Sequence, residues 1–142
     1  MQSIVAFLLV LQPVFFTLPP QANDRAAYAQ IVAEKNPQTK KKLALNFEKN
    51  FPKSKSLPDV YMELSRILVS ESDFNTARQY ADKAVSTVEK MKTQPAPPEY
   101  TTSTWHEWLN TVAASANKNL AWVNQMVTWQ QEQLRSTLRG KR

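Results

Sequence analysis

The stretch SESDFNTARQYADKAV, residues 70–85, decides the fold of this chain. Its first four residues are all polar, which predicts a short turn. From Phe74 onward the apolar residues recur at alternating intervals of three and four, a spacing typical of one helical face. These positions are Phe74, Ala77, Ala81, Ala84 and, just beyond the stretch, Val88. We therefore expect a polar turn that leads directly into a helix.

A second helix is expected immediately before that turn. Pro58 suits the first turn of a helix, because the N–H that proline lacks has no partner there. Ser56 with Asp59 resembles a capping box at the start of the same helix. The apolar stripe that follows has helical spacing and consists of Val60, Tyr61, Leu64, Ile67 and Leu68. Two helices joined by a short turn predict an antiparallel hairpin.

This hairpin resembles a tetratricopeptide repeat (TPR), a helix–turn–helix unit about 34 residues long. The family has large residues and one small residue on its first helix, and alanines on its second helix where the two cross closely. The matching positions are Tyr61, Leu64, Ser65 and Leu68 on the first helix and Phe74, Ala77, Ala81 and Ala84 on the second. The resemblance implies stacked helical hairpins whose first helices line a concave binding surface.

The resemblance extends upstream in a weaker form. Tyr28 and Ile31 each stand 33 residues before Tyr61 and Leu64, which suggests a related, shortened first hairpin. Residues 51–54, FPKS, are similar to a junction common in bacterial envelope proteins of this type. The resemblance therefore covers roughly residues 25–91.

Two departures from the family pattern matter. Ser72 stands in the turn where the family often has glycine, and the first hairpin lacks the alanine pattern. Stacks of this family usually need at least three repeats. We therefore expect the C-terminal helices, or a second copy of the chain, to cover the end of the stack. A plain helical bundle with alanines at its crossings is the alternative.

Two more helices are expected upstream of the hairpin. Residues 25–35 place apolar side chains on one helical face, with Asn23 or Asp24 as the N-cap. Asn36 and the proline after it mark the start of the next helix. The proline after Phe51 predicts the end of that helix, because proline disfavours helical geometry in the preceding residue.

Residues 1–22 carry no charged side chain and resemble a secretory leader. Two apolar runs are separated by Pro13 and followed by Pro19 and Pro20, and Ala22 is a small residue suited to cleavage. The apolar runs are short for a membrane span, which needs about 20 residues. Because the usual basic residue near the start is missing, an uncleaved membrane anchor and a buried helix stay as alternatives.

The C-terminal part begins after the clearest linker, residues 93–104, which contains three prolines. Thr104 and Glu107 predict a capping box for the helix that follows. Its apolar positions are Trp105, Leu109, Val112, Ala116, Leu120, Val123, Val127, Leu134 and Leu138. Residues 114–119 are a candidate break, so this segment is one long helix or two. The only glycine, Gly140, is expected as its C-cap.

Composition excludes much chemistry. There is no cysteine, so disulfides, thiolate nucleophiles and thiolate metal sites are excluded. A single glycine cannot form a glycine-rich phosphate loop. His106, the only histidine, is expected on the surface, and Glu71 with Asp73 is better explained by turn capping than by acid–base chemistry. We predict no enzyme, no metal and no cofactor.

The net charge is +6, from 18 basic and 12 acidic residues. Such an excess favours acidic partners or simply gives a solvated surface. The lysines near residues 40–42 and the basic residues after Arg135 lack interleaved exposed aromatics, so we do not expect nucleic acid as a partner. The four tryptophans, at positions 105, 108, 122 and 129, are expected to pack over the hairpins; exposure to a membrane or a partner is the alternative.

These observations predict an all-α fold with TPR-like helical hairpins and one or more additional C-terminal helices. The expected division is a leader (1–22), the hairpins (23–92), a Pro-rich linker (93–104) and a Trp-rich helical segment (105–142).

The predicted function is non-catalytic protein or peptide binding in an exported compartment, periplasmic or extracellular. The resemblance implies a binding face formed by Asp59, Met62, Arg66, Val69 and Ser70. There Arg66 would pair with an acidic group, and Met62 and Val69 would supply apolar contact. The alternative is an envelope-associated structural protein that uses its Trp-rich segment for membrane contact or oligomerisation.

Overall fold

The computed structural model of the chain describes residues 20–141, with side chains from residue 23 onward. In this part of the chain, all regular structure is helical. The helices are α1 (Pro20–Ala33), α2 (Pro37–Asn50), α3 (Leu57–Ser70), α4 (Phe74–Lys92) and α5 (Thr102–Arg139). The prediction of an all-α fold is thus confirmed for the described residues.

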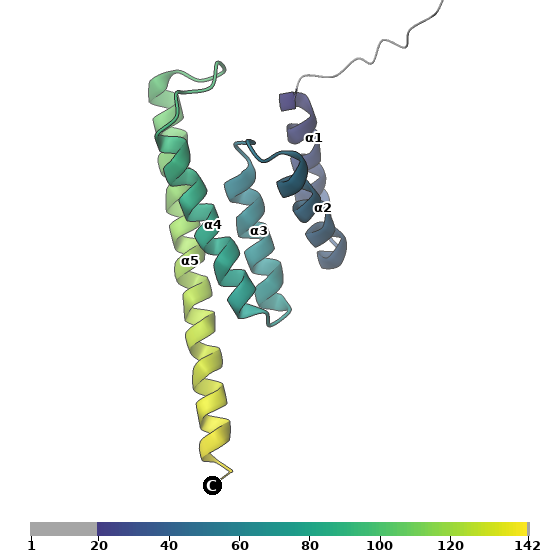
Figure 1. Ribbon diagram of the computed structural model, residues 1–142, viewed down its shortest axis with the longest axis vertical. Helices are drawn as coiled ribbons and strands as arrows, with labels where there is room; N and C mark the ends of the chain where they lie inside the picture. Colours follow the sequence, from purple (N-terminus) through teal and green to yellow (C-terminus); the bar gives the residue numbers. More distant parts are fainter. Residues whose placement is uncertain (1–19, 142) are drawn as a thin grey trace, which may run out of the picture.

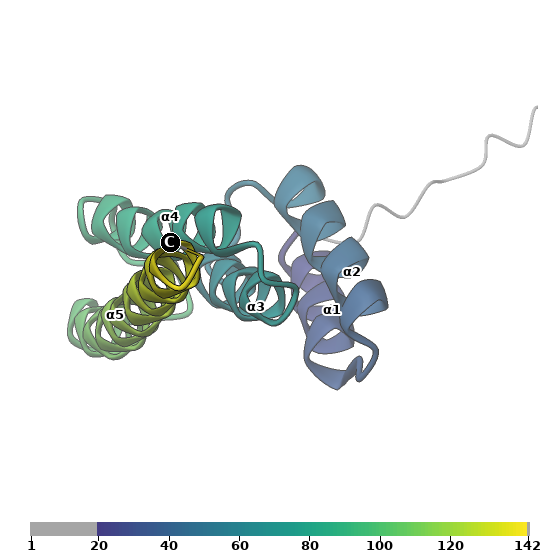
Figure 2. The same ribbon diagram turned by 90° about the horizontal axis from the view of Figure 1, so that it is seen from below.

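The helices pack as successive antiparallel neighbours (Figure 1). α1 packs on α2, α3 packs on α4, and α5 runs back along α4 while also contacting α3. Seen from below, α3 lies in the middle, with α1 and α2 on one side and α4 and α5 on the other (Figure 2). The far end of α5 extends beyond the turn that joins α3 to α4 (Figure 1).

The α3–α4 hairpin has the most extensive packing in the described structure. Ala77, Ala81 and Ala84 of α4 are completely buried, and their small side chains allow the two helices to approach closely. The positions singled out in the sequence are all buried: Tyr61, Leu64, Ser65, Leu68, Phe74, Ala77, Ala81 and Ala84. The spacing of apolar and small residues therefore predicted this hairpin correctly.

The turn of the hairpin places Ser72 in the left-handed region, with φ at 63°. The Ser72 N–H donates to the Val69 carbonyl at 3.0 Å, and the Asp73 N–H donates to the Leu68 carbonyl at 2.9 Å. An L-residue in this conformation costs about 1–2 kcal/mol, which glycine avoids. Asp73 then caps α4, because its carboxylate accepts a hydrogen bond from the Thr76 N–H at 3.2 Å.

The core is shared between the hairpins. Ile31 of α1, Phe47 of α2 and Leu64 of α3 belong to one buried cluster. A second cluster joins the end of α4 to the start of α5 through Val88 and Trp105. A third joins α3, α4 and α5 through Leu68, Ala77, Ala81 and Val123. The first half of α5 therefore closes the outer side of the α3–α4 hairpin.

The boundaries of α2 confirm the sequence reading. The Asn36 side chain accepts hydrogen bonds from the N–H groups of Gln38 and Thr39 at 3.0 and 3.1 Å. α2 ends at Asn50, directly before the expected end at Phe51. Asparagine caps and proline-directed ends depend on local backbone geometry, so the sequence alone was enough to place them.

One other expected helix start is wrong, and one expected side-chain cap is missing although Ser56 is the N-cap of α3. α1 begins at Pro20 rather than at an Asn23 or Asp24 cap, so its first residues fall inside the expected leader. The rest of that leader, residues 1–19, lies outside the described residues. Ser56 makes no side-chain cap for α3; its own N–H donates to the buried Ser54 hydroxyl instead.

α5 begins earlier than the predicted capping box of Thr104 and Glu107. The N-cap is Thr101, and Thr104 is the residue that returns its hydrogen bond. The Thr104 N–H donates to the Thr101 hydroxyl at 3.2 Å, and the Thr101 N–H donates to the Thr104 hydroxyl at 3.0 Å. Threonine can fill both places of the box, so the expected linker is shortened at its C-terminal end.

α5 is one helix of 38 residues, which answers the question of one helix or two. The polar side chains in residues 114–119 bond along the helix: Ser115 donates to the Thr111 carbonyl at 3.1 Å and Asn117 to the Ala113 carbonyl at 2.9 Å. Gly140 is the C-cap, as expected. None of the helices within residues 20–141 has both the length and the hydropathy to span a membrane.

Candidate partner-binding face on α3

The five residues expected to bind a partner differ in how far they are accessible. Arg66 and Ser70 are exposed, Asp59 and Val69 are partly buried, and Met62 is buried. The Ser70 hydroxyl is already used within α3, where it donates to the Ile67 carbonyl at 2.6 Å. The structure therefore keeps Arg66 and Asp59 as the polar groups of this face that could meet a partner.

Met62 packs inside the protein. Only 4% of its surface is exposed, and it lies in the cluster that contains Ile31 and Phe47 of the first hairpin. The first hairpin sits directly against this position of α3, so Met62 holds the two hairpins together. Val69 is also partly covered, by the cluster that joins α3 to α5. Neither residue offers the open apolar surface that the resemblance implied.

Arg66 already has a partner within the chain. Its guanidinium Nη1 lies 2.7 Å from Glu63 Oε1, one turn earlier on α3. The other Glu63 oxygen lies 3.8 Å from the Lys40 ammonium of α2. A pair at this helical spacing contributes only about 0.2–0.5 kcal/mol when exposed. Since half of the Arg66 side chain is exposed, a partner carboxylate could compete with Glu63 for it.

Asp59 is the unusual acid of this face. It lies partly buried in the first turn of α3, and no cation among residues 23–141 comes within 4 Å of its carboxylate. Burial raises the pKa of Asp59 above its ordinary value; Arg66 opposes this shift and Glu63 adds to it. The ionised carboxylate is therefore disfavoured by its surroundings, which do not compensate for the lost water.

Tyr28 of α1 completes the group. Burial, and then the nearby charges of Asp59 and Glu63, raise the pKa of Tyr28 to about 12, so its hydroxyl is neutral at physiological pH. Its ring meets Phe47 edge-on, with centroids 6.4 Å apart. We call Tyr28, Asp59, Glu63 and Arg66 the α1–α3 patch. It combines a neutral phenol, two carboxylates and one guanidinium on adjacent helices.

Two members of the patch were not expected from the sequence. Glu63 could have been found, because it lies four residues after Asp59 and three before Arg66, on the same side of a helix. Tyr28 was expected only as a repeat position matching Tyr61. Its nearness to Asp59 depends on how the two hairpins pack, and no local pattern encodes that packing.

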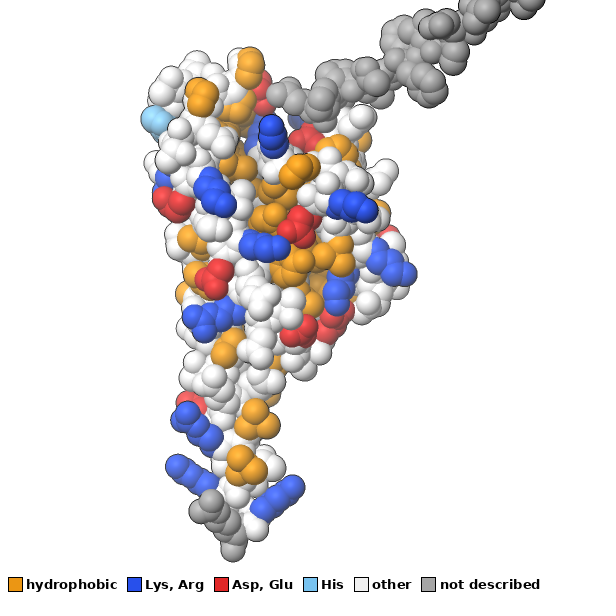
Figure 3. Space-filling model, in the orientation of Figure 1, with side chains coloured by type: hydrophobic (Ala, Val, Ile, Leu, Met, Phe, Trp, Pro, Cys, Tyr) orange, Lys and Arg blue, Asp and Glu red, His pale blue; other side chains and the backbone are white. Residues whose placement is uncertain are grey.

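A different charged cluster joins α2 to α4. The Lys83 ammonium lies 2.8 Å from Glu48 Oε1 and above the rings of Tyr80 and Tyr61, at 4.7 and 5.5 Å from their centroids. Figure 3 shows this side of the molecule, where hydrophobic side chains gather between the hairpins with charged ones among them. All of these charges find partners within the chain, so the cluster serves to join helices.

An aromatic cluster closes the end of the molecule where α4 and α5 meet. The rings of Trp105 and Trp108 stack at 5.0 Å, and Tyr100 packs against both. Lys55 donates to the Tyr100 hydroxyl at 3.1 Å and pairs with Glu99 at 3.0 Å. Two of the four tryptophans thus pack against the fold, as expected; the other two are exposed, so that part of the expectation is wrong. Lys55 ties the loop before α3 to the loop after α4.

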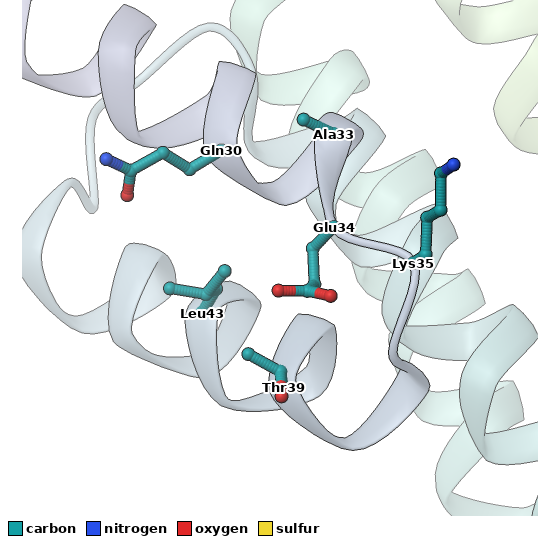
Figure 4. Close-up of a pocket in the computed structure, with 6 residues that line it drawn as sticks. All are labelled: Gln30, Ala33, Glu34, Lys35, Thr39 and Leu43. Carbon is teal, nitrogen blue, oxygen red and sulfur yellow. The ribbon is translucent and has the colours of Figure 1, made fainter.

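A shallow depression lies between α1 and α2 (Figure 4). Its lining residues are Gln30, Ala33, Glu34, Lys35, Thr39 and Leu43. The Glu34 carboxylate already accepts a hydrogen bond from the Asn36 N–H at 2.7 Å. The depression is open to solvent and its polar groups do not converge on one point, so it lacks the features of a ligand site.

Among the described residues, no group of three or more His, Asp or Glu side chains could hold a metal ion. His106 is exposed at the start of α5, as expected. Comparisons with protein-family models, with curated proteins and with solved structures found no match for this chain. The candidate site therefore depends on the geometry of the α1–α3 patch alone.

Proposed function

We propose that this protein is a non-catalytic, TPR-like interaction module whose α1–α3 patch binds a basic segment of a partner protein. The observation that carries the proposal is the partly buried Asp59 carboxylate, for which residues 23–141 provide no cation within 4 Å. A cation supplied from outside would stabilise the ionised carboxylate. In a protein partner, that cation is a lysine or arginine side chain.

The neighbours of Asp59 suit the same role. The Tyr28 ring offers a rigid surface at small entropic cost, and its neutral hydroxyl can bond to a peptide backbone. Glu63 adds a second negative charge beside Asp59. Arg66, once displaced from Glu63, can bind an acidic group that follows the basic residue of the partner. The patch therefore favours a mixed-charge segment that presents a basic residue to Asp59.

The TPR-like part of the proposal is supported by the α3–α4 hairpin. Its alanines are buried at the helix crossing, and its turn residue Ser72 adopts the backbone conformation that glycine favours. In the family that the sequence resembles, the first helix of each hairpin lines the binding surface. α1 and α3 hold those places here, and the α1–α3 patch lies on them.

Titration with a short lysine-rich peptide, followed by amide NMR shifts, tests the proposed site. We expect shifts centred on Tyr28, Asp59 and Glu63, and their loss in Asp59→Asn. The matched control is Asp82→Asn on α4, where the exposed carboxylate lies 3.9 Å from Arg78. If the peptide shifts residues elsewhere, or binds Asp59→Asn as tightly as the unchanged protein, the site is wrong.

Export is proposed from residues 1–22 alone. The intact mass and location of the protein in its own cell provide the test. A mass beginning at Asn23 in a soluble exported fraction supports a cleaved leader. A mass that includes residues 1–22 in the membrane fraction would make them an anchor, and the same mass in the cytosol would contradict export.

A further inference from the structure

The end of α5 has no covering helix in the described structure. Val123 is the last buried residue of α5, and every side chain from residue 131 to residue 141 is exposed. Figure 1 shows this end of α5 extending alone past the α3–α4 turn, and Figure 3 shows hydrophobic and basic side chains along it. We call residues 124–141 the α5 tail.

The tail continues the apolar seam that α5 uses inside the fold. The seam advances by four and three residues in strict alternation, and its members are Leu109, Ala113, Ala116, Leu120, Val123, Val127, Gln130, Leu134 and Thr137. The positions up to Val123 are buried or partly buried against α3 and α4. A narrow stripe with this period is typical of a helix that packs along another helix. In the tail, Val127 and Gln130 are partly buried, and Leu134 and Thr137 face solvent, with Leu134 at 59% exposure.

The tryptophans of α5 lie on a different side from this seam. Trp129 and Leu134 are five residues apart, which separates them by about 140° around the helix. Trp122, two turns above Trp129, lies on the same side as Trp129. A helix that lies in a membrane surface gathers its apolar residues on one broad face. In the tail, Met126 lies between the seam and Trp129, so the apolar residues spread over about half of the helix circumference. The continuity of the seam with the buried part of α5 favours a second helix as its occupant.

The charges of the tail select the direction of that second helix. Arg135 and Arg139 lie beside the seam, whereas the α3–α4 turn carries the acids Glu71 and Asp73. Glu71 is also bound by Lys41 and Gln38 of α2, so a second copy would share its carboxylate with them. This turn lies near Val123, because Val123 packs against Leu68 and Ala77 on either side of it. An antiparallel copy of the tail would bring its arginines to this turn. A parallel copy would instead place the basic ends of both tails together, where they repel.

We infer that the α5 tail pairs with the α5 tail of a second copy of this chain, in antiparallel orientation, with Leu134 of each copy opposite Val127 of the other. Gln130 then lies at the centre of the pairing, where a polar seam residue fixes the register. The contact extends the seam already buried within each copy. It does not depend on the α1–α3 patch, which lies on other helices.

The dimer is expected to be weak, because a pairing this short falls below the area of about 1,200 Å² that stable interfaces bury. Sedimentation velocity over a wide range of protein concentrations measures it. We expect a monomer–dimer equilibrium that Leu134→Gln with Leu138→Gln weakens at least about tenfold. Trp129→Gln is the matched control on the other side of the helix, and it should leave the equilibrium unchanged. A protein that stays monomeric at every concentration overturns the inference.

Charge exchange tests the direction of the pairing. One variant carries Arg135→Glu and Arg139→Glu, and the other carries Glu71→Lys. Each variant alone should dimerise less than the unchanged protein, because tail and turn then have like charges. Their mixture should form heterodimers, because both tail–turn contacts then join opposite charges. Mixing that gives no more dimer than the separate variants contradicts the antiparallel arrangement.

The cysteine-free chain allows a direct test of register. Gln130→Cys should cross-link two copies under mild oxidation, since the central positions of an antiparallel pair lie together. Leu138→Cys should not cross-link, because in an antiparallel pair the two copies of residue 138 lie at opposite ends of the contact. Cross-linking through Leu138→Cys indicates a parallel pair, in which both positions lie beside their equivalents, and refutes the proposal. The protein could instead be monomeric in solution and float with anionic vesicles in a way that depends on Trp129. That result would overturn the pairing and make a membrane surface the occupant of the seam.

Discussion

The α3–α4 hairpin and the α5 tail have similar patterns of apolar residues but opposite surroundings. Leu64 in the hairpin is completely buried, whereas Leu134 in the tail is 59% exposed. Both stand on apolar stripes with helical spacing. The difference shows that spacing identifies the side of a helix that will be covered, but not whether this chain covers it. The hairpin is covered by α1, α2 and α5, whereas residues 131–141 of the tail are exposed.

The largest expected effect comes from the same substitution made in each region. Leu64→Ala should destabilise the protein by about 2–5 kcal/mol, because it opens a cavity among fully packed neighbours. Leu134→Ala should change the stability of the monomer by less than about 0.5 kcal/mol, because it removes little packing. Urea unfolding at low protein concentration measures both values. Equal effects would mean that the tail is packed as firmly as the hairpin.

The next largest effect concerns a hydrogen bond between α5 and the α3–α4 hairpin. The Asn119 amide donates to the Ser65 hydroxyl at 2.8 Å, and both residues are buried. Ser65→Ala leaves this amide unpaired and should cost about 1–3 kcal/mol. Asn117→Ala is the control, because the Asn117 side chain bonds only to its own helix and is exposed. Denaturant midpoints distinguish the two variants.

Adding Asn119→Leu to Ser65→Ala sharpens that test. The double variant removes the unpaired amide and replaces it with an apolar group of similar size, so part of the lost stability should return. The unfolding free energy lost in the double variant could instead equal the sum of the losses in the two single variants. In that case the hydrogen bond does not couple the two residues.

A smaller change in stability is expected from substitutions in the turn of the hairpin and at the end of the tail. Ser72→Gly should stabilise the protein by about 0.5–1 kcal/mol, because it relieves the left-handed backbone of the turn. Gly140→Ala in the tail should be tolerated, because Gly140 has a φ of −72° and an added Cβ would meet its nearest neighbour at 3.7 Å. Thermal unfolding of both variants checks the contrast. A loss of stability in Ser72→Gly would mean that the Ser72 side chain stabilises the turn by more than the left-handed backbone conformation destabilises it.

The smallest effect concerns two carboxylates at opposite ends of α3. Burial raises the pKa of Asp59, so its contribution to stability is present at low pH and is lost as pH rises. Hydrogen bonds from Lys41 and Gln38 lower the pKa of Glu71, so its contribution is present at neutral pH and is lost as pH falls. Asp59→Asn should therefore slightly stabilise the protein at neutral pH, and Glu71→Gln should slightly destabilise it.

Both differences should disappear in acid, where the carboxylates of the unchanged protein are protonated. Unfolding free energies measured between acidic and neutral pH test this opposite behaviour. Differences with the same sign at neutral pH would contradict the assignment of Asp59 as an uncompensated charge. That result would also remove the main support for the proposed binding face.

The candidate site shows the limit of sequence reasoning in a single group of side chains. Asp59 and Arg66 could be placed on one side of α3 from their spacing, and the structure keeps both accessible. Met62 was expected beside them, but the first hairpin covers it. Tyr28 could not be assigned to the site, because 31 residues separate it from Asp59 and only the packing of α1 beside α3 brings them together.

The sequence by itself determined the helices, the α3–α4 hairpin and most of its buried positions, because these follow from contacts between residues three or four apart. It also determined the Asn36 cap and the end of α2, which depend on one or two neighbouring residues. Only the tertiary structure decided that Met62 is covered and that α5 extends past the hairpin. Those features depend on which surfaces meet and where each ends, and contacts between distant segments have no fixed spacing along the chain.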